Sequence, residues 1–288
     1  MTIKKLLATL VAVSSFTALP ALASAPASCP ATLRFADTGI EGMEEMVRTY
    51  GEFQQKLTEV LGLEVRFFPV SDRTAAVNAL QFNQVDMILA GPSEYAVMRA
   101  RQPVKMMVGI ERTNYGTAFV VHEDSGIYSL QDLKGKRVAL KDPGSTTGHI
   151  VPSKMLHEAG LNINRDLRLM LLDGARFEAL INRDVDAMGS GVRDVERLQE
   201  RDPNGRYRVI AESDTMPRDI FVARGGIDDS CVAYVSDKMM EHSEALLDAI
   251  LNPGERRKYR GARFVNDLTE AEYDRITRAY ALVGYPLD

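Results

Sequence analysis

The sequence has no tryptophan, only two cysteines and only four histidines among its 288 residues. Two cysteines are too few for the dense disulfide framework of a small secreted domain. The histidines stand in no metal-binding spacing such as H-E-x-x-H, and no G-x-S-x-G nucleophile motif occurs. We therefore expect no metal, no other cofactor and no enzymatic activity.

Excess positive charge is also missing, because the formal net charge is −5. Proteins that bind the phosphate backbone of nucleic acids need clustered Lys and Arg, so nucleic acid is not expected as a partner. A small anion remains possible as a ligand, since it needs only local positive potential. Beyond the N-terminus, no segment approaches the roughly 20 apolar residues of a membrane span.

The N-terminus has the pattern of a signal peptide. Two lysines in MTIKK precede the apolar run LLATLVAVSSFTALPALA, and the small residues near Ala23 offer a cleavage site. A membrane anchor is the alternative, but Pro20 and the shortness of the segment disfavour it. The interpretation is a signal peptide over residues 1–23 and export to the periplasm. In that oxidising compartment Cys29 and Cys231 are candidates for a disulfide, the alternative being two buried free thiols.

Short apolar runs alternate with helical patterns, which predicts an α/β protein with mostly parallel sheets covered by helices. The series occurs twice, with NQVDMILAG in the first half and RDVDAMGSG in the second. We expect two lobes of similar build, one formed by residues 24–116 and 218–288, the other by residues 117–217. The chain is expected to cross between them near residues 115–118 and 215–219.

The stretch KDPGSTTGHIVP places Gly144, Ser145, Thr146, Thr147 and Gly148 where a strand turns into a helix. Such a turn exposes unpaired backbone N–H groups and the positive end of the helix dipole, which together bind anions. The three hydroxyls add hydrogen-bond donors. The alternative is an ordinary helix N-cap. For His149, in the first helical turn, a contact with the anion and a contact with solvent both remain open.

A second candidate lies in the other lobe, at AGPSEY. Pro92 suits the first position of a helix, and Ser93 places a hydroxyl near that N-terminus. Ligands of α/β proteins bind at the carboxyl ends of parallel strands, where this turn is expected. Tyr95 either faces such a cleft or packs internally.

Longer stretches of the sequence resemble the PhnD-like periplasmic binding proteins of phosphonate, phosphite and phosphate ABC transporters. The resemblance rests on LRFAxT, FFPVSD, QFNQVDMILAGPSEY, DLKGKRVALKDPGSTTG and the C-terminal ARFVNDLTEAEYDRI. It implies a two-lobed type II periplasmic binding protein that closes on an oxyanion at the hinge. Ser145, Thr146 and Thr147 match the Ser-Thr-Ser turn that binds the phosphorus-bound oxygens in this family. Tyr115 and Asp219 match a hinge tyrosine and an acceptor that selects a protonated or amine-bearing ligand.

Three positions depart from the family pattern. Arg73 stands where many relatives have tyrosine, Asp173 where many have a ligand-contacting histidine, and Arg193 near a position that is acidic in aminophosphonate receptors. Two arginines at the cleft would favour a more negative ligand. The alternative is that Arg73 and Arg193 point outward. Phosphate, phosphite, an alkylphosphonate and an arsenic oxyanion all remain open as ligands.

These features lead to the hypothesis of a monomeric exported receptor that delivers a phosphorus-type oxyanion to an ABC permease in the inner membrane. One alternative is a receptor of the same fold that reports its ligand to a membrane histidine kinase. A periplasmic enzyme acting on phosphorylated metabolites is a third possibility, which the missing metal and nucleophile motifs disfavour.

Overall fold

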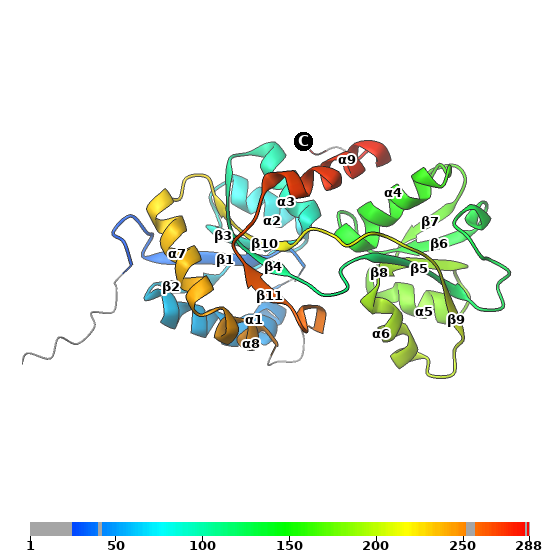
Figure 1. Ribbon diagram of the computed structural model, residues 1–288, viewed down its shortest axis with the longest axis horizontal. Coiled ribbons are helices and arrows are strands. Elements are labelled where there is room, and N and C mark those ends of the chain that lie inside the picture. The colour runs from blue at the N-terminus through cyan, green and yellow to red at the C-terminus, as the bar shows by residue number, and fades with distance from the viewer. Residues whose placement is uncertain (1–24, 40–41, 252–256, 286, 288) are drawn as a thin grey trace, which may run out of the picture.

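The computed structural model describes residues 25–39, 42–251, 257–285 and 287, so the predicted signal peptide lies outside the described residues. Two β-sheets lie side by side along the long axis of the molecule, and helices cover both faces of each (Figure 1). Within the described ranges, no helix is both long enough and apolar enough to cross a membrane.

Lobe 1 contains the first sheet, with the strand order β11-β4-β10-β3-β1-β2. Its strands are β1 (Thr32–Asp37), β2 (Glu64–Phe67), β3 (Met87–Ala90), β4 (Val104–Glu111), β10 (Asp219–Arg224) and β11 (Arg263–Val265). One face packs against α1 (Met43–Leu61), α7 (Asp229–Glu241) and α8 (Ser243–Leu251). The other packs against α2 (Arg73–Gln81) and α3 (Pro92–Arg101).

Lobe 2 contains the second sheet, with the strand order β7-β6-β8-β5-β9. Its strands are β5 (Thr117–His122), β6 (Arg137–Leu140), β7 (Arg168–Leu171), β8 (Ala187–Gly191) and β9 (Tyr207–Glu212). Helix α4 (Val151–Glu158) covers one face, and α5 (Arg176–Ile181) and α6 (Arg193–Arg201) cover the other. Short helical turns are η1 (Gln131–Leu133), η2 (Thr146–Ile150), η3 (Asp173–Ala175), η4 (Arg257–Tyr259) and η5 (Glu270–Tyr273).

Both sheets are mixed rather than mostly parallel. Strands β1, β2 and β3 pair in parallel, and so do β6, β7 and β8. The strands that follow a passage between lobes pair antiparallel with their neighbours, β10 with β3 and β4, and β5 with β8 and β9. A strand that enters a lobe from the other lobe runs antiparallel to the neighbouring strands of the βαβ units in that lobe. This explains why the sheets are mixed, whereas the sequence predicts mostly parallel sheets.

Local sequence explains the helix that follows β1. Apolar residues recur every three or four positions in α1, and Met46, Tyr50, Phe53 and Leu57 are buried on one face. The helix ends at Gly62, which adopts a left-handed conformation with φ 59° that glycine accepts without steric cost. The same βα rhythm places the carboxyl ends of β1 and β3 at the edge of the sheet that faces lobe 2.

Three segments join the lobes. The chain passes from β4 to β5 through residues 112–116 and from β9 to β10 through residues 213–218. The C-terminal helix α9 (Asp274–Val283) packs against α3 of lobe 1 and α4 of lobe 2 (Figure 1). An apolar cluster that includes Ala96, Ile150, Ile276 and Tyr280 fills this junction.

Cys29 and Cys231 form a disulfide in the structure. The bond ties the segment ahead of β1 to α7, and the hydroxyls of Ser28 and Ser230 lie 2.7 Å apart beside it. The sulfur of Cys231 is in the buried core of lobe 1. The disulfide therefore fastens the start of the described chain to a helix that follows 202 residues later.

Candidate functional site

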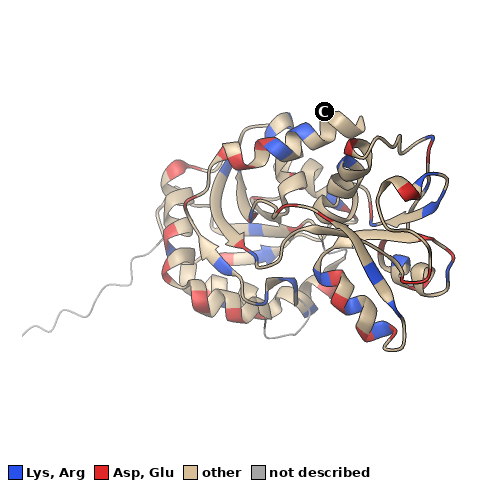
Figure 2. Cartoon of the chain, turned by 45° about the vertical axis from the view of Figure 1, so that its right-hand side comes forward, with Lys and Arg blue, Asp and Glu red and all other residues tan. Residues whose placement is uncertain are grey.

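A cleft of about 820 Å³ lies between the two lobes. Its lobe 1 wall comes from the carboxyl ends of β1 and β3, the start of α2 and the segment after β4, and its lobe 2 wall from the loop after β6 and the start of α6. Among the residues that the structure describes, nine Lys or Arg and six Asp or Glu line it, so this part of the wall is formally positive although the whole chain has a net charge of −5. Over the rest of the molecule charges of both signs are spread across both lobes (Figure 2).

The Gly-Ser-Thr-Thr stretch forms part of the lobe 2 wall, in a turn of residues 142–148 that we call the STT turn. Gly144 has a φ of 82°, and η2 that follows is a π-helical turn in which the N–H groups of His149 and Ile150 both donate to the carbonyl of Ser145. Ser145, Thr146 and Thr147 all line the cleft. The first N–H groups of a helical turn have no partner within it, so they are available to an anion.

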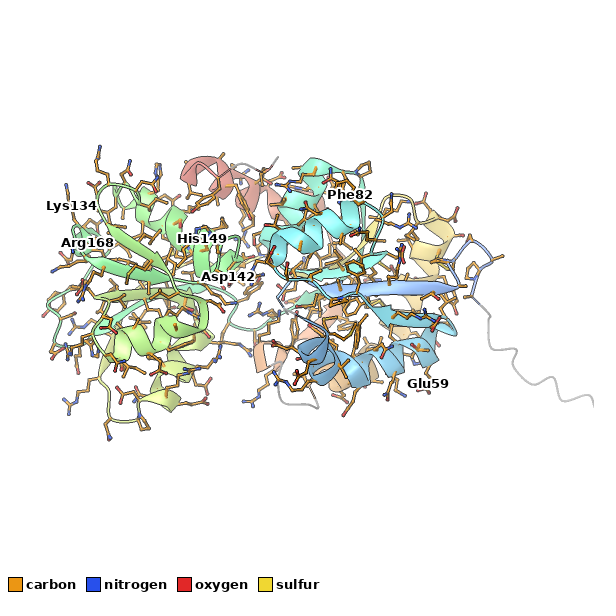
Figure 3. All side chains as sticks on the ribbon, turned by 180° about the vertical axis from the view of Figure 1, so that it is seen from behind. Glu59, Phe82, Lys134, Asp142, His149 and Arg168 are labelled. Atoms are coloured by element: carbon orange, nitrogen blue, oxygen red, sulfur yellow. A yellow bond between two sulfur atoms is a disulfide. The ribbon has the colours of Figure 1, made fainter. Side chains whose placement is uncertain are left out.

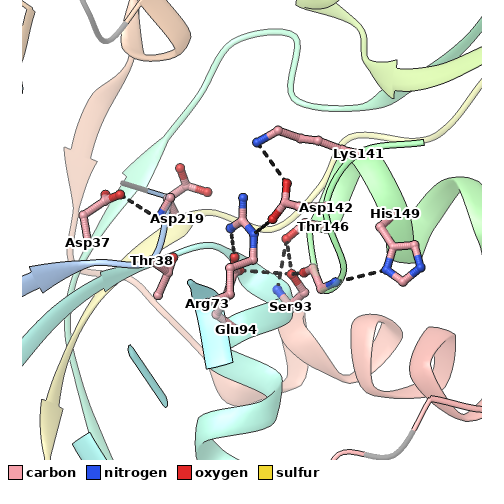
Figure 4. Close-up of polar contacts among 12 residues, drawn as sticks. Asp37, Thr38, Arg73, Ser93, Glu94, Lys141, Asp142, Thr146, His149 and Asp219 are labelled. Carbon is pink, nitrogen blue, oxygen red and sulfur yellow. Dashed lines mark hydrogen bonds and ion pairs between the residues drawn. The ribbon is translucent and has the colours of Figure 1, made fainter. Parts of the chain in front are cut away.

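The STT turn also contacts lobe 1 through Ser93. The backbone N–H of Ser93 donates to the Thr146 hydroxyl at 3.1 Å, and the two hydroxyl oxygens are 2.6 Å apart. The Ser93 hydroxyl also lies 2.6 Å from the carbonyl oxygen of Gly144, to which it can donate (Figure 4). Ser93 is fully buried, so its hydroxyl fastens the two lobes and does not line the cleft.

Arg73 lies in the cleft wall between two carboxylates. Its Nε donates to Asp142 of lobe 2 at 2.5 Å, and its Nη1 pairs with Glu94 of lobe 1 (Figure 4). Burial would raise the pKa of Asp142, but the charges of Arg73 and Lys141 outweigh that effect and lower the pKa to about 2. Arg73 points into the cleft, which excludes the outward orientation.

A second cationic group borders the hinge. The guanidinium of Arg112 stacks over the ring of Tyr115, 3.7 Å from its centroid, and donates to Asp219 at 3.4 Å. The Tyr259 hydroxyl donates to the same Asp219 oxygen at 3.0 Å. Burial, followed by the charge of Asp219, raises the pKa of Tyr115, so this hydroxyl stays protonated as a donor. Asp219, Tyr115 and Arg112 all line the cleft.

Arg193 also lines the cleft, at the start of α6. Its Nη2 donates to the carbonyl of Thr113 at 3.1 Å and to the carbonyl of Arg260 at 2.8 Å. Both acceptors belong to the lobe 1 side of the cleft. Arg193 therefore bridges the two lobes next to the segment that follows β4. The outward alternative for Arg193 is excluded as well.

Four other predicted residues lie outside the cleft wall. Tyr95 is buried against Tyr273, with ring centroids 4.5 Å apart, so it packs internally. His149 is fully buried near the junction between the lobes (Figure 3), where its Nδ1 accepts a hydrogen bond from the backbone N–H of Gly144 at 3.0 Å. It therefore contacts neither solvent nor the cleft. Gly148 is buried at the end of the STT turn, and its carbonyl accepts a hydrogen bond from the N–H of Lys141.

Asp173 is the fourth of these residues. Its side chain is 60% exposed and lies 3.6 Å from the ammonium of Lys141. It begins the short turn η3, outside the residues that line the cleft. Lys141 lines the cleft itself, and so does Arg176, whose Nη1 donates to the backbone carbonyl of Asp173, so Asp173 supports the cleft wall through these two residues.

Sequence reasoning missed several residues of the cleft wall. Asp37 ends β1 and Thr38 follows it, Glu94 lies in the first turn of α3, and Arg112 follows β4. The signal was present, because ligands of α/β proteins gather at the carboxyl ends of strands, where Asp37, Thr38 and Arg112 stand. Further missed residues come from lobe 2 and from the segment before β11: Lys141, Arg176, Asp194, Lys258 and Arg260.

Arg176 and Asp194 support the lobe 2 wall. Arg176 is 2% exposed and pairs with Asp194 at 2.7 Å, and its Nε donates to the Ser190 hydroxyl at 3.0 Å. The pKa of Asp194 is lowered, because Arg176, Ser190 and Arg197 outweigh the effect of burial. Hydroxyl, guanidinium and ammonium donors thus dominate a cleft that also offers carboxylate acceptors, which suits an oxyanion that carries a proton.

The chain matches the family described as "ABC transporter, phosphonate, periplasmic substrate-binding protein" over residues 39–263. It is similar to the phosphate-import protein PhnD of Mycolicibacterium smegmatis, at 28% identity over 141 residues that cover 46% of this chain and 43% of that protein. It is also similar to the probable ABC transporter phosphite binding protein PhnD1 of Prochlorococcus marinus, at 23% identity over 179 residues that cover 55% of this chain and 60% of that protein. The chain thus matches about half the length of these relatives.

The fold is that of a solved structure, PhnD1 from Prochlorococcus marinus in complex with methylphosphonate. The TM-score is 0.73 at 17% identity, and the alignment covers 90% of this chain and 100% of that chain. The two-lobed type II fold and the PhnD-like resemblance are both confirmed. Because the family match extends over more than half of the sequence, this chain belongs to the phosphonate family of ABC-transporter periplasmic substrate-binding proteins.

Proposed function

We propose that this protein captures a phosphorus-type oxyanion, namely a phosphonate, phosphite or phosphate, in the cleft between its lobes and delivers it to an ABC permease. The observation that carries the proposal is the position of the STT turn. Its residues Ser145 and Thr147, which carry hydroxyls beside the N–H groups of a helical turn, line the same cleft as Arg73. This combination provides several donors to one tetrahedral anion.

The carboxylates of the cleft refine the expected protonation state of the ligand. Asp219 can only accept hydrogen bonds, so an oxygen or nitrogen of the ligand must carry a proton to face it. Arg112 already neutralises part of the charge of Asp219. A monohydrogen form of the oxyanion fits both walls, because its unprotonated oxygens meet the STT turn and its protonated group meets Asp219.

Binding is expected to stabilise the closed arrangement of the lobes. Contacts that form only when both walls reach the ligand shift the open–closed equilibrium toward the closed form. The permease would then recognise the closed receptor. We further propose that the protein acts as a monomer in the periplasm, after removal of residues 1–23.

A thermal-shift panel on the mature, phosphate-stripped protein tests the ligand class. It contains phosphate, phosphite, methylphosphonate, 2-aminoethylphosphonate, arsenate, arsenite, sulfate and a sugar phosphate. A ligand at about 100 times its Kd stabilises the fold by roughly 2.7 kcal/mol, which raises Tm by a few degrees. We expect a shift with one phosphorus oxyanion and none with sulfate.

A variant pair links that shift to the STT turn. The double substitution Ser145→Ala and Thr147→Ala should abolish the shift, whereas Ser236→Ala, a helix substitution in α7 away from the cleft, should leave it unchanged. No shift with any phosphorus compound, or an undiminished shift in the double variant, would contradict the proposal.

A further inference from the structure

The guanidinium of Arg73 is held by both lobes at once. Arg73 begins α2 in lobe 1, and its two carboxylate partners are Glu94 at the start of α3 in lobe 1 and Asp142 after β6 in lobe 2. Only 16% of the Arg73 side chain is exposed, and 3% of that of Glu94. Each partner occupies a different nitrogen, Nε for Asp142 and Nη1 for Glu94.

The third nitrogen of Arg73 is directed to the cleft. Nη2 lies beside Gly39, 3.9 Å from the position at which a side chain on that glycine would begin. Within the described residues Nη2 has no hydrogen-bond partner, and both Gly39 and Arg73 line the cleft. A planar guanidinium with two of its nitrogens fixed has its third donor fixed in direction as well.

We propose that Asp142 is a positioning residue that couples ligand binding to contact between the lobes: it holds Arg73 from the opposite lobe so that Nη2 is aimed at the ligand. Glu94 supplies the same support within lobe 1. The ligand part of this inference rests on the proposed function, whereas the contact between lobes is independent of it. No other carboxylate of lobe 2 contacts Arg73 among the described residues.

Neighbouring contacts show that the loop carrying Asp142 is docked as a unit. Two residues further on, the carbonyl of Gly144 lies 2.6 Å from the Ser93 hydroxyl, and Thr146 accepts from the Ser93 N–H. The low pKa of Asp142, about 2, keeps this carboxylate ionised at neutral pH. The Asp142–Arg73 pair is thus the charged member of a continuous patch of contacts between the lobes.

Such a pair affects affinity through the population of the arrangement that can bind. If the lobes spend less time in contact, the apparent Kd rises in inverse proportion to the competent fraction. Loss of Asp142 should also leave the guanidinium with one fixed nitrogen, so Nη2 loses its direction. Both effects weaken binding without removing any atom that touches the ligand.

The experiment compares Asp142→Asn, Arg73→Gln, the double variant and Asp142→Glu. Asp124→Asn is the matched control, because exposed Asp124 pairs with Arg183 within lobe 2. Inorganic phosphate and methylphosphonate are titrated separately by calorimetry, the Tm of each ligand-free variant verifies folding, and small-angle X-ray scattering gives its radius of gyration.

We expect Asp142→Asn to raise Kd on the order of tenfold, the scale of typical coupling between sites. The double variant should bind no more weakly than Arg73→Gln alone, because Asp142 acts through Arg73. Asp142→Glu should recover part of the affinity, and Asp124→Asn should bind as the unmodified protein does. The ligand-free Asp142→Asn protein should have a larger radius of gyration.

Three results would overturn the inference. Additive losses in the double variant, or unchanged affinity in Asp142→Asn, would show that Asp142 does not act through Arg73. An unchanged radius of gyration in ligand-free Asp142→Asn would show that the pair does not hold the lobes together. If the unmodified protein binds no phosphorus oxyanion, the proposed function fails, but the scattering comparison still decides whether the pair holds the lobes.

Discussion

The hydroxyl of Thr146, in lobe 2, accepts a hydrogen bond at 3.1 Å from the backbone N–H of Ser93, the second residue of α3 in lobe 1. Helix α3 begins at Gly91 and Pro92 without a side-chain cap of its own. The first N–H groups of a helix need a partner from outside it. Thr146 thus caps a helix of the other lobe, and one residue of the STT turn serves the contact between lobes while its neighbours Ser145 and Thr147 line the cleft.

Replacing Thr146 with valine should therefore cost stability as well as affinity. Valine keeps the branched shape but has no hydroxyl, so the Ser93 N–H loses its acceptor. We expect the free energy of unfolding to fall by about 1 kcal/mol, the usual cost of a lost cap. Urea denaturation of the ligand-free protein measures it.

Thr147→Val is the matched control for this prediction. Thr147 lines the cleft, and its backbone carbonyl, which the substitution keeps, accepts from the Thr117 hydroxyl at 2.8 Å. Its unfolding free energy should change by no more than about 0.5 kcal/mol. Equal stabilities of the two variants would show that the Ser93–Thr146 contact contributes nothing.

Gly148, the last residue of the STT turn, allows its backbone to approach the side chains of Lys141 and Ser145 closely. A Cβ on Gly148 would lie 2.4 Å from Cβ of Lys141 and 3.0 Å from Oγ of Ser145. Gly148→Ala must therefore displace the turn, and we expect a loss of about 1–3 kcal/mol in unfolding free energy together with weaker ligand binding. Differential scanning calorimetry and calorimetric titration measure the two effects.

Gly174→Ala provides the comparison, because nothing lies within 4 Å of a Cβ at that position and its φ is not positive. That variant should melt and bind like the unmodified protein. If both glycine substitutions behave alike, space at Gly148 is not what the turn requires.

The alternation of strands and helices, the doubling of the series and the glycine-rich turn could all be predicted from sequence, because each depends on neighbouring residues. The roles of single side chains were harder to predict. Thr146 meets Ser93 from 53 positions away, and Arg73 meets Asp142 from 69 positions away. No local sequence pattern indicates which residues of one lobe will face a given turn of the other lobe. The sequence therefore predicts for this turn either an anion site or a cap of its own helix, and not a contact between lobes.

Tyr95 and His149 illustrate a related limit. Both lie one turn into a helix that starts near the cleft, where a rotation of about 100° per residue separates the cleft from the interior. The C-terminal region decides the outcome, because Tyr273 packs on Tyr95 and the ring of Tyr285 packs on His149. That contact depends on how α9 and its flanking turns dock, which the helical pattern alone does not specify.

The disulfide should contribute strongly to stability. Joining Cys29 to Cys231 closes a loop of about 200 residues and restricts the unfolded chain, which for such bonds is typically worth about 2–4 kcal/mol. The double variant Cys29→Ser and Cys231→Ser should melt several degrees lower than the oxidised protein. Addition of dithiothreitol should lower the Tm of the unmodified protein and leave that of the variant unchanged. A reductant effect of equal size in both proteins would refute the assignment.

His149 should make stability depend on pH between about 6.5 and 4. It is fully buried, and burial lowers its pKa from 6.5 to about 4 despite the nearby charge of Asp142. Because the folded pKa lies below the unfolded one, the unfolded state binds more protons in this window, and stability rises with pH. The stability that the neutral, buried His149 contributes is fully present above pH 6.5 and is lost as the pH falls toward 4, by roughly 3 kcal/mol.

The variant His149→Asn can still accept a hydrogen bond from the Gly144 N–H but does not titrate. Urea midpoints from pH 7.5 down to 4.5 should therefore fall less steeply in His149→Asn than in the unmodified protein, and parallel slopes would show that His149 is not the group responsible.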